Sequence, residues 1–275
     1  MIQPQTNKPR RVRPKPRLAE VVRVHRLTPH FVRVVFAGHE LEGFATKGPA
    51  EHLKVHLPRP GESKVSLPEW GPDGPILAEG QQRPVNRTYT PRRWDIETKE
   101  LTVDFLLHGE GPGSTWAQQA RPGQVVAVSQ QPGGAYKVDV EADWYVIGGD
   151  EAALPAVGTL LEALPSTCSA HVFVEVADEA EEQELESPAR CRVTWLHHGG
   201  TPGKIGRGLE RAVREFLFPE GRGHVWIGCE AGVMRDIRRH LLNERKMERS
   251  HAHTQGYWKY GAVNHPDNDR GQDVE

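Results

Sequence analysis

Residues 87–92, read as Arg-Thr-Tyr-Thr-Pro-Arg, bring an aromatic ring, hydroxyls and cations together in a short stretch. The ring of Tyr89 can lie flat against a flavin isoalloxazine. The hydroxyl and amide of Thr90 can bond the flavin near N5, where a hydride arrives. Arg87 and Arg92 can hold a pyrophosphate through forked, charged hydrogen bonds. The pattern is typical of a flavin-binding strand, and the alternative is an ordinary β-strand whose basic residues face water.

A glycine-rich run at 108–117, His-Gly-Glu-Gly-Pro-Gly-Ser-Thr-Trp-Ala, follows soon afterwards. A β-type pattern ends at Leu107, and we expect Ser114 or Thr115 to cap a short helix over 116–120. The free amides and dipole of a helix start bind a pyrophosphate without a cation, and glycines let the backbone approach it closely. A flexible turn between strand and helix is the alternative. The position of the glycine-rich run about twenty residues after Arg87 favours the phosphate site.

A third segment, 146–156, runs from an apolar strand through Gly148 and Gly149 into a helical pattern, with Asp150 expected as the N-cap. It lacks the G-x-G-x-x-G spacing, so the simple dinucleotide fingerprint is absent. Two interpretations stay open here: a nicotinamide nucleotide lying over the turn, and plain packing of a strand against its helix.

The elements that must position these segments change type along the chain. Short β-type runs at 18–25, 31–36, 52–57, 87–90, 101–107 and 124–128, with a long loop at 58–84, predict a closed antiparallel barrel. From 144 onward, β runs at 144–147, 171–176, 192–196, 224–228 and 257–260 alternate with helical stripes. This predicts a doubly wound parallel sheet, which binds ligands beyond the carboxyl ends of its strands. We expect a disordered basic arm at 1–17, the barrel at 18–141, the α/β domain at 142–261 and a disordered tail at 262–275.

The totals exclude several classes of protein. The chain has 275 residues, 37% of them hydrophobic and 26% charged, and a formal net charge of −2, so no nucleic-acid partner is indicated. No apolar run reaches the roughly 20 residues of a membrane span, and no secretory signal begins the chain. Three separated cysteines argue against disulfides and a zinc site. We therefore expect a cytoplasmic monomer with no membrane partner and no bound metal.

Five motifs in this order resemble the siderophore-interacting protein family, which comprises flavin-dependent ferric-siderophore reductases built like ferredoxin–NADP reductases. They lie at 87–92, 108–117, 148–156, 225–232 and 257–261, and the resemblance runs from about Leu18 to Gly261. It implies an N-terminal Greek-key β-barrel that binds FAD, followed by a doubly wound domain that binds NAD(P)H.

The resemblance also implies roles for particular residues. The flavin site would comprise Arg87, Tyr89, Thr90, Arg92, His108, Gly109, Gly111, Gly113 and Ser114, with Trp116 bracing the short helix. The nicotinamide side would comprise Gly149, Asp150, Glu151 and Glu230. Lys54 and Lys259 would contact the ferric siderophore. Arg235 lies off the apolar stripe of its expected helix and is a further candidate for contact with the chelate or a nucleotide phosphate. Each of the three is also consistent with a solvated surface residue. No general acid, nucleophile or iron ligand is required, because the flavin carries the electrons.

The expected activity is an NAD(P)H-dependent, FAD-containing reduction of ferric siderophores that releases Fe(II). One alternative is a flavin-dependent reductase that passes electrons to a protein partner. A non-enzymatic alternative is a protein that binds ferric siderophores without turnover. The choice between NADH and NADPH stays open: acids at 175–178 favour a free ribose 2′-hydroxyl, yet such an acidic run is also typical of a solvated loop. Cys229 is either near the nicotinamide or a small buried residue.

Overall fold

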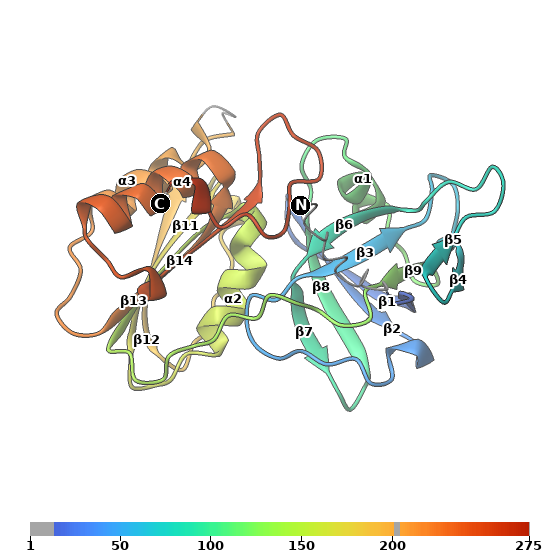
Figure 1. Ribbon diagram of the computed structural model, residues 1–275, viewed down its shortest axis with the longest axis horizontal. Coiled ribbons are helices and arrows are strands. Elements are labelled where there is room, and N and C mark those ends of the chain that lie inside the picture. Colours follow the sequence, from blue (N-terminus) through green and yellow to red (C-terminus); the bar gives the residue numbers. More distant parts are fainter. Residues whose placement is uncertain (1–13, 201–203, 275) are drawn as a thin grey trace, which may run out of the picture.

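The computed structural model describes residues 14–200 and 204–274 and contains two main β-sheets, with the chain passing from one to the other after residue 136 (Figure 1). Most of the expected basic arm, 1–13, lies outside the described residues. The N-terminal sheet is antiparallel and the C-terminal sheet is parallel, so the predicted change of architecture along the chain is confirmed.

The antiparallel sheet has the strand order β6-β3-β9-β1-β2-β8-β7 within the described residues. Its strands are β1 (Arg17–Thr28), β2 (Phe31–Ala37), β3 (Leu53–Leu57), β6 (Val85–Tyr89), β7 (Pro91–Asp95), β8 (Glu100–Leu106) and β9 (Val125–Val128). Only Thr90 separates β6 from β7, yet these strands form opposite edges, so the sheet must curl until its edges approach. The described ladder pairs do not include β6 with β7, and the result is a curled half-barrel rather than the fully closed barrel expected. The predicted loop at 58–84 carries a small hairpin of β4 (Glu69–Gly71) and β5 (Gly74–Ile76).

A helix closes the interior of this half-barrel. Alternate residues of the strands point inward and are fully buried, as the β period of two requires. Helix α1 (Pro112–Gln118) inserts Trp116 among them. The Trp116 ring stacks on Phe36 with 6.2 Å between ring centroids and lies 5.3 Å from Phe105. The glycine-rich run before α1 is therefore held at one end of the half-barrel by an aromatic anchor.

The parallel sheet has the order β12-β11-β10-β13-β14, which confirms the predicted doubly wound topology. Its strands are β10 (Trp144–Asp150), β11 (Ser169–Val176), β12 (Arg190–His197), β13 (Gly223–Glu230) and β14 (Ala252–Trp258), and its helices are α2 (Leu154–Glu162), α3 (Arg207–Glu215) and α4 (Ala231–Arg239). The strand order reverses between β10 and β13, so their carboxyl ends form the switch point at which such sheets bind ligands. None of the described helices is long and apolar enough to cross a bilayer.

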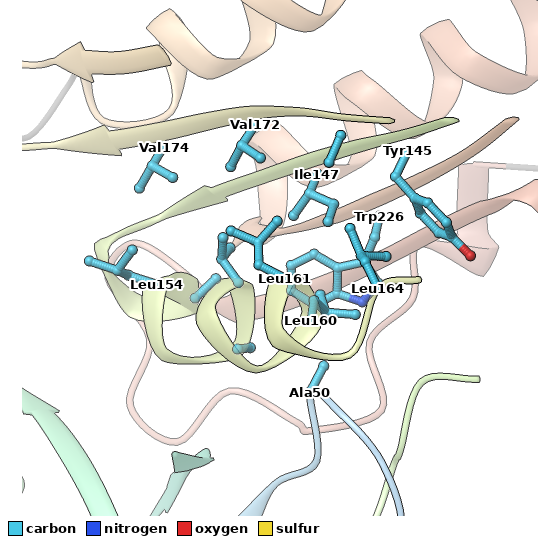
Figure 2. Close-up of a cluster of buried hydrophobic side chains, with 14 of the residues drawn as sticks. Ala50, Tyr145, Ile147, Leu154, Leu160, Leu161, Leu164, Val172, Val174 and Trp226 are labelled. Carbon is cyan, nitrogen blue, oxygen red and sulfur yellow. The ribbon is translucent and has the colours of Figure 1, made fainter. Parts of the chain in front are cut away.

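Helix α2 lies between the two sheets. Along β10, Tyr145 and Ile147 face α2, whereas Trp144 and Val146 face α3 and α4. Figure 2 shows Leu160 and Leu161 of this helix, with Leu164 just beyond its end, packed against Tyr145, Ile147, Val172, Val174 and Trp226. The other side of α2 meets the half-barrel, because Ala50 belongs to the same buried cluster (Figure 2).

Polar contacts fix the two parts of the chain against each other. Arg92 of β7 lies over Gly158 and bonds Glu162 at 2.5 Å. Glu181, which is buried, accepts hydrogen bonds from the Thr28 hydroxyl at 2.5 Å and from the amide of His30 at 3.0 Å. These contacts hold any site between the sheets in a defined geometry.

The C-terminal segment makes contacts with the parallel sheet. Residues 262–274 fold back along the free edge of β14, where the amide of Gly256 bonds the carbonyl of Asp269 at 2.9 Å. Arg235 of α4 holds Asp269 and Asp273, each at 2.9 Å. The edge strand and Arg235 thus supply partners that the polar composition of the segment does not reveal.

Candidate functional site

A cavity of about 350 Å³ opens between the half-barrel and the carboxyl ends of the parallel strands. Of the residues singled out in the sequence, the structure brings Arg87, Tyr89, Thr90, His108, Gly111, Gly113, Ser114 and Glu151 to its wall. These residues come from β6, from the run before α1, from α1 itself and from the turn after β10. Motifs separated by more than sixty positions therefore share one cavity.

Strand β6 supplies the aromatic and cationic wall of the cavity. The ring of Tyr89 packs on Phe105 with 4.3 Å between centroids, and burial raises the pKa of its phenol, which stays neutral. Arg87 bonds the carbonyl of Asn86 at 2.8 Å and the side-chain oxygen of Asn264 at 3.3 Å. An arginine and a neutral phenol thus lie together where a planar, anionic cofactor would require them.

The glycine-rich run forms an open cradle beside this wall. Gly109 has a φ of +53°, and a side chain at Gly111 would meet nothing within 4 Å, so the backbone is accessible from the cavity. A Cβ at Gly113, by contrast, would collide with the Tyr89 hydroxyl. The hydroxyl of Ser114 is buried and has no hydrogen-bond partner in the described residues. A buried polar atom without a partner is costly, so this hydroxyl fits a ligand oxygen.

The helix after the cradle begins earlier than expected. Helix α1 starts at Pro112, and Gly111 is its N-cap without a side-chain hydrogen bond. Neither Ser114 nor Thr115 caps the helix, because both lie inside it. Proline suits the first position of a helix, because the amide hydrogen that it lacks would have no partner there and its φ is already helical. This explains the earlier start.

Asp150 joins three strands at the switch point. It is 2% exposed and accepts hydrogen bonds from the amide of Ala152 at 3.0 Å, the amide of Glu230 at 2.9 Å and the indole of Trp258 at 2.7 Å. Burial raises the pKa of Asp150 to about 7, against the lowering effect of these hydrogen bonds. Gly149 lies against Val157 and Ala153, so it packs strand to helix. Both residues shape the floor of the site and do not line the cavity.

Two other acids, which were expected on the nicotinamide side, accept hydrogen bonds from backbone amides. Glu151 lines the cavity and accepts a hydrogen bond from the amide of Ala177 at 2.8 Å. Glu230 caps α4 through the amides of Gly232 at 2.6 Å and Val233 at 3.0 Å. Each carboxylate therefore has a fixed orientation near the ends of β10 and β13.

The acids suggested for ribose discrimination have structural contacts. Glu175 turns inward and accepts hydrogen bonds from Gly208 at 2.7 Å and Leu209 at 3.2 Å, at the start of α3. Asp178 accepts one from the amide of Ala180 at 2.9 Å. Cys229 is fully buried, burial raises the pKa of its thiol, and it does not line the cavity. It is thus a small packing residue.

The remaining predicted residues divide between the cavity edge and other places. Lys54 of β3 donates to the Thr88 hydroxyl at 2.6 Å and pairs with Asp267, two residues that line the cavity. Arg235 is held by Asp269 and Asp273 away from the cavity wall. Lys259 is exposed just beyond β14. Arg92 lies on α2, Trp116 lies in the half-barrel core, and Gly109 lies in the turn before α1.

Several wall residues were given no role from the sequence. Residues 262–265 and Asp267 form one side of the cavity, and His52, Thr88 and Gln255 also line it. Only the fold of the C-terminal segment brings the first of these to the site. No group of three or more potential metal ligands occurs among the described residues.

Taken together, the wall offers a forked cation, a neutral aromatic ring, accessible glycine backbone and an unpartnered hydroxyl. This donor set fits the pyrophosphate and ring of a flavin dinucleotide.

The comparisons with known proteins agree with this set. Residues 20–136 match the model of the siderophore-interacting FAD-binding domain, and residues 142–261 match that of the siderophore-interacting protein. The ferric vibriobactin reductase ViuB of Vibrio cholerae is 31% identical over 249 residues, covering 90% of each chain. The NADPH-dependent ferric-chelate reductase of Escherichia coli is 30% identical over 242 residues, covering 86% of this chain and 91% of the relative. A siderophore utilization protein from T. fusca has a structure with a TM-score of 0.81 and 40% identity, covering 92% of this chain and 96% of that one.

Proposed function

The chain belongs to the siderophore-interacting protein family, and from that premise we propose that it is an NAD(P)H-dependent, FAD-containing reductase of ferric siderophores. The observation that carries the proposal is the buried, unpartnered Ser114 hydroxyl in a glycine cradle that shares its cavity with Arg87 and Tyr89. NADPH is the favoured donor, because a relative with 30% identity is named for its dependence on NADPH.

We propose that the cavity holds FAD. Arg87 and Ser114 would bind the pyrophosphate with the exposed backbone at Gly109 and Gly111, and Tyr89 would pack against the ring and exclude water from one side. Bound FAD would supply the exchange of a two-electron hydride for single electrons. The residues of the chain would orient the reactants and keep water out.

The hydride donor would approach over the ends of β10 and β13. Glu151 lies at that edge of the cavity, and its carboxylate is fixed by the amide of Ala177. Asp150 would keep the ends of β10, β13 and β14 together through its three hydrogen bonds. Its role would be that of a positioning residue, because a buried side chain outside the cavity wall does not touch a ligand there.

The substrate would arrive with its iron already coordinated, so the protein needs no iron ligands of its own. Lys54 would attract an anionic chelate to the cavity edge, within reach of the ring. Fe(II) binds hard oxygen donors more weakly than Fe(III), so reduction would release the metal. We further propose that the protein acts as a cytoplasmic monomer without nucleic-acid or membrane partners. Its near-neutral net charge supports the absence of a nucleic-acid partner. Sedimentation at equilibrium would check the monomer.

An anaerobic visible spectrum tests the proposal directly. The purified protein, reconstituted with FAD, should lose its flavin absorbance when NADPH is added and recover it when a ferric siderophore and an Fe(II) trap follow. Recovery without Fe(II) would point to a different acceptor. A protein that takes up no FAD would contradict the proposal at its first step. The same titration with NADH measures the preference between the two donors.

A further inference from the structure

The segment between Ala262 and Asp267 crosses from the parallel sheet to the half-barrel at the mouth of the cavity. It follows β14, and Figure 1 shows it in red, arching between the two parts of the molecule. Positive φ angles at Gly261 (+74°) and Asn264 (+60°) allow the chain to turn at these points. We call residues 262–267 the strap.

The strap is anchored where it joins the segment along the sheet edge. Beyond it, Asp269 is bound by Arg235 at 2.9 Å and by His265 at 2.8 Å, and its carbonyl accepts the amide of Gly256. Val263, near the middle, is 80% exposed and therefore packs little against the protein.

The strap also touches the half-barrel through polar side chains. Asp267 pairs with Lys54 and accepts a hydrogen bond from the Thr88 hydroxyl at 2.7 Å. Asn264 accepts one from Arg87 at 3.3 Å. The carboxylate of Asp267 is therefore paired with Lys54, the cation that the proposed function assigns to the incoming chelate. This pair lies at the wall of the cavity.

From this geometry we propose that Asp267 determines substrate specificity, as an internal anion that an iron chelate must displace from Lys54 and Thr88. The identity of the ligand rests on the proposed function. A chelate with several negative charges competes well for the lysine, whereas a neutral chelate gains little by displacing the carboxylate. The strap thereby selects for strongly anionic chelates, such as tris-catecholate complexes, over neutral hydroxamate complexes.

The competition should have a moderate magnitude. The side chains of Lys54 and Asp267 are 40% and 23% exposed, so solvent screens their attraction. Removing the carboxylate should therefore tighten binding of a triply charged complex by about fivefold, the upper range for partly exposed ion pairs. A neutral complex should change by less than about twofold, because it gains no charge attraction.

The experiment measures binding separately from reduction. Gallium(III) complexes have the charge and shape of the iron complexes but are not reduced, so quenching of protein fluorescence by a gallium tris-catecholate and by neutral gallium desferrichrome reports affinity alone. Asp267→Asn keeps the shape of the side chain and removes its charge. Asp73→Asn, in the exposed turn between β4 and β5, removes the same net charge far from the cavity and serves as the matched control.

The expected result is a higher affinity of Asp267→Asn for the gallium tris-catecholate. Its affinity for gallium desferrichrome should be nearly unchanged, as should both affinities of the Asp73→Asn control. The gain should disappear in the double variant Lys54→Met, Asp267→Asn, because the unmasked cation is then missing. Equal affinities in Asp267→Asn and Asp73→Asn would overturn the inference, as would a gain that persists without Lys54. Failure of the reductase proposal can be distinguished from failure of this inference. In that case NADPH would bleach the flavin without release of Fe(II), while Asp267→Asn would still change the affinity for the gallium tris-catecholate.

Discussion

Replacement of Ser114 by alanine should have opposite effects on the free protein and on its complex with FAD. The Ser114 side chain is 3% exposed in relative terms, and its hydroxyl has no partner in the described residues. Removing it relieves an unsatisfied buried group, so the free energy of unfolding of the FAD-free protein should stay the same or rise by about 1 kcal/mol. Most buried polar truncations lower stability, which makes this sign informative.

In the complex, the same hydroxyl is expected to donate to a charged phosphate oxygen. A hydrogen bond to a charged group contributes about 1.5–3 kcal/mol, which corresponds to a roughly 10- to 150-fold increase in the Kd for FAD. The FAD-free protein would be followed by urea denaturation, and the affinity by quenching of flavin fluorescence during titration. Thr115→Ala is the matched control, because Thr115 is the next residue of α1 and is exposed.

The reasoning would be refuted if Ser114→Ala lowered the stability of the FAD-free protein by more than about 1 kcal/mol, since the hydroxyl would then have a partner. It would equally be refuted if the Kd for FAD matched that of Thr115→Ala. The first result would contradict the local geometry, and the second would contradict the assignment of the cradle to the pyrophosphate.

Three further substitutions test the framework around the site. Glu181→Ala leaves the Thr28 hydroxyl and the His30 amide without their buried acceptor, so urea denaturation should show a loss of about 2–4 kcal/mol, whereas the exposed Glu179→Ala should change little. Burial raises the pKa of Asp150 to about 7, above its unfolded value of roughly 4, so its contribution to stability is full at low pH and is lost as pH rises through that window. The stability of the wild type relative to Asp150→Asn should therefore fall between those pH values, and a constant difference would contradict the assignment. Gly134→Ala adds a Cβ 2.7 Å from the ring of His52 at a φ of +77°, and its thermal unfolding should show about 1–2 kcal/mol more destabilisation than Gly61→Ala, which has a φ of +85° and open space.

Local patterns in the chain were sufficient for most of the fold. Alternate residues of β2 and β8, ending in Phe36 and Phe105, belong to the half-barrel core, and the helical stripe of α2 likewise depends only on neighbouring positions. The local pattern therefore predicted both sheets and the change between them. Closure of the barrel could not be predicted in the same way. It depends on whether β6 and β7 form a ladder, and that depends on how far a sheet of this length curls.

The candidate site was predicted in part. Arg87, Tyr89 and Ser114 came from motifs whose residue types match a cofactor, and the fold gathers them in one cavity. Arg92 and Trp116 belong to the same motifs but have structural contacts, because strand alternation and the helical turn direct them away from the cavity. The spacing of a motif indicates which segments lie near the cavity. The direction of each side chain decides whether that residue reaches the cavity.

By itself, the sequence determined the chemistry available to this protein, because residue types and short-range spacing limit what a strand end or helix start can bind. It also determined the order of the two sheets, since each follows from local periodicity. Only the tertiary structure decided that Asp267 pairs with Lys54 and that residues 262–267 cross the mouth of the cavity. These residues are more than two hundred positions apart, and no local pattern records a contact between the edge of one sheet and a strand of another.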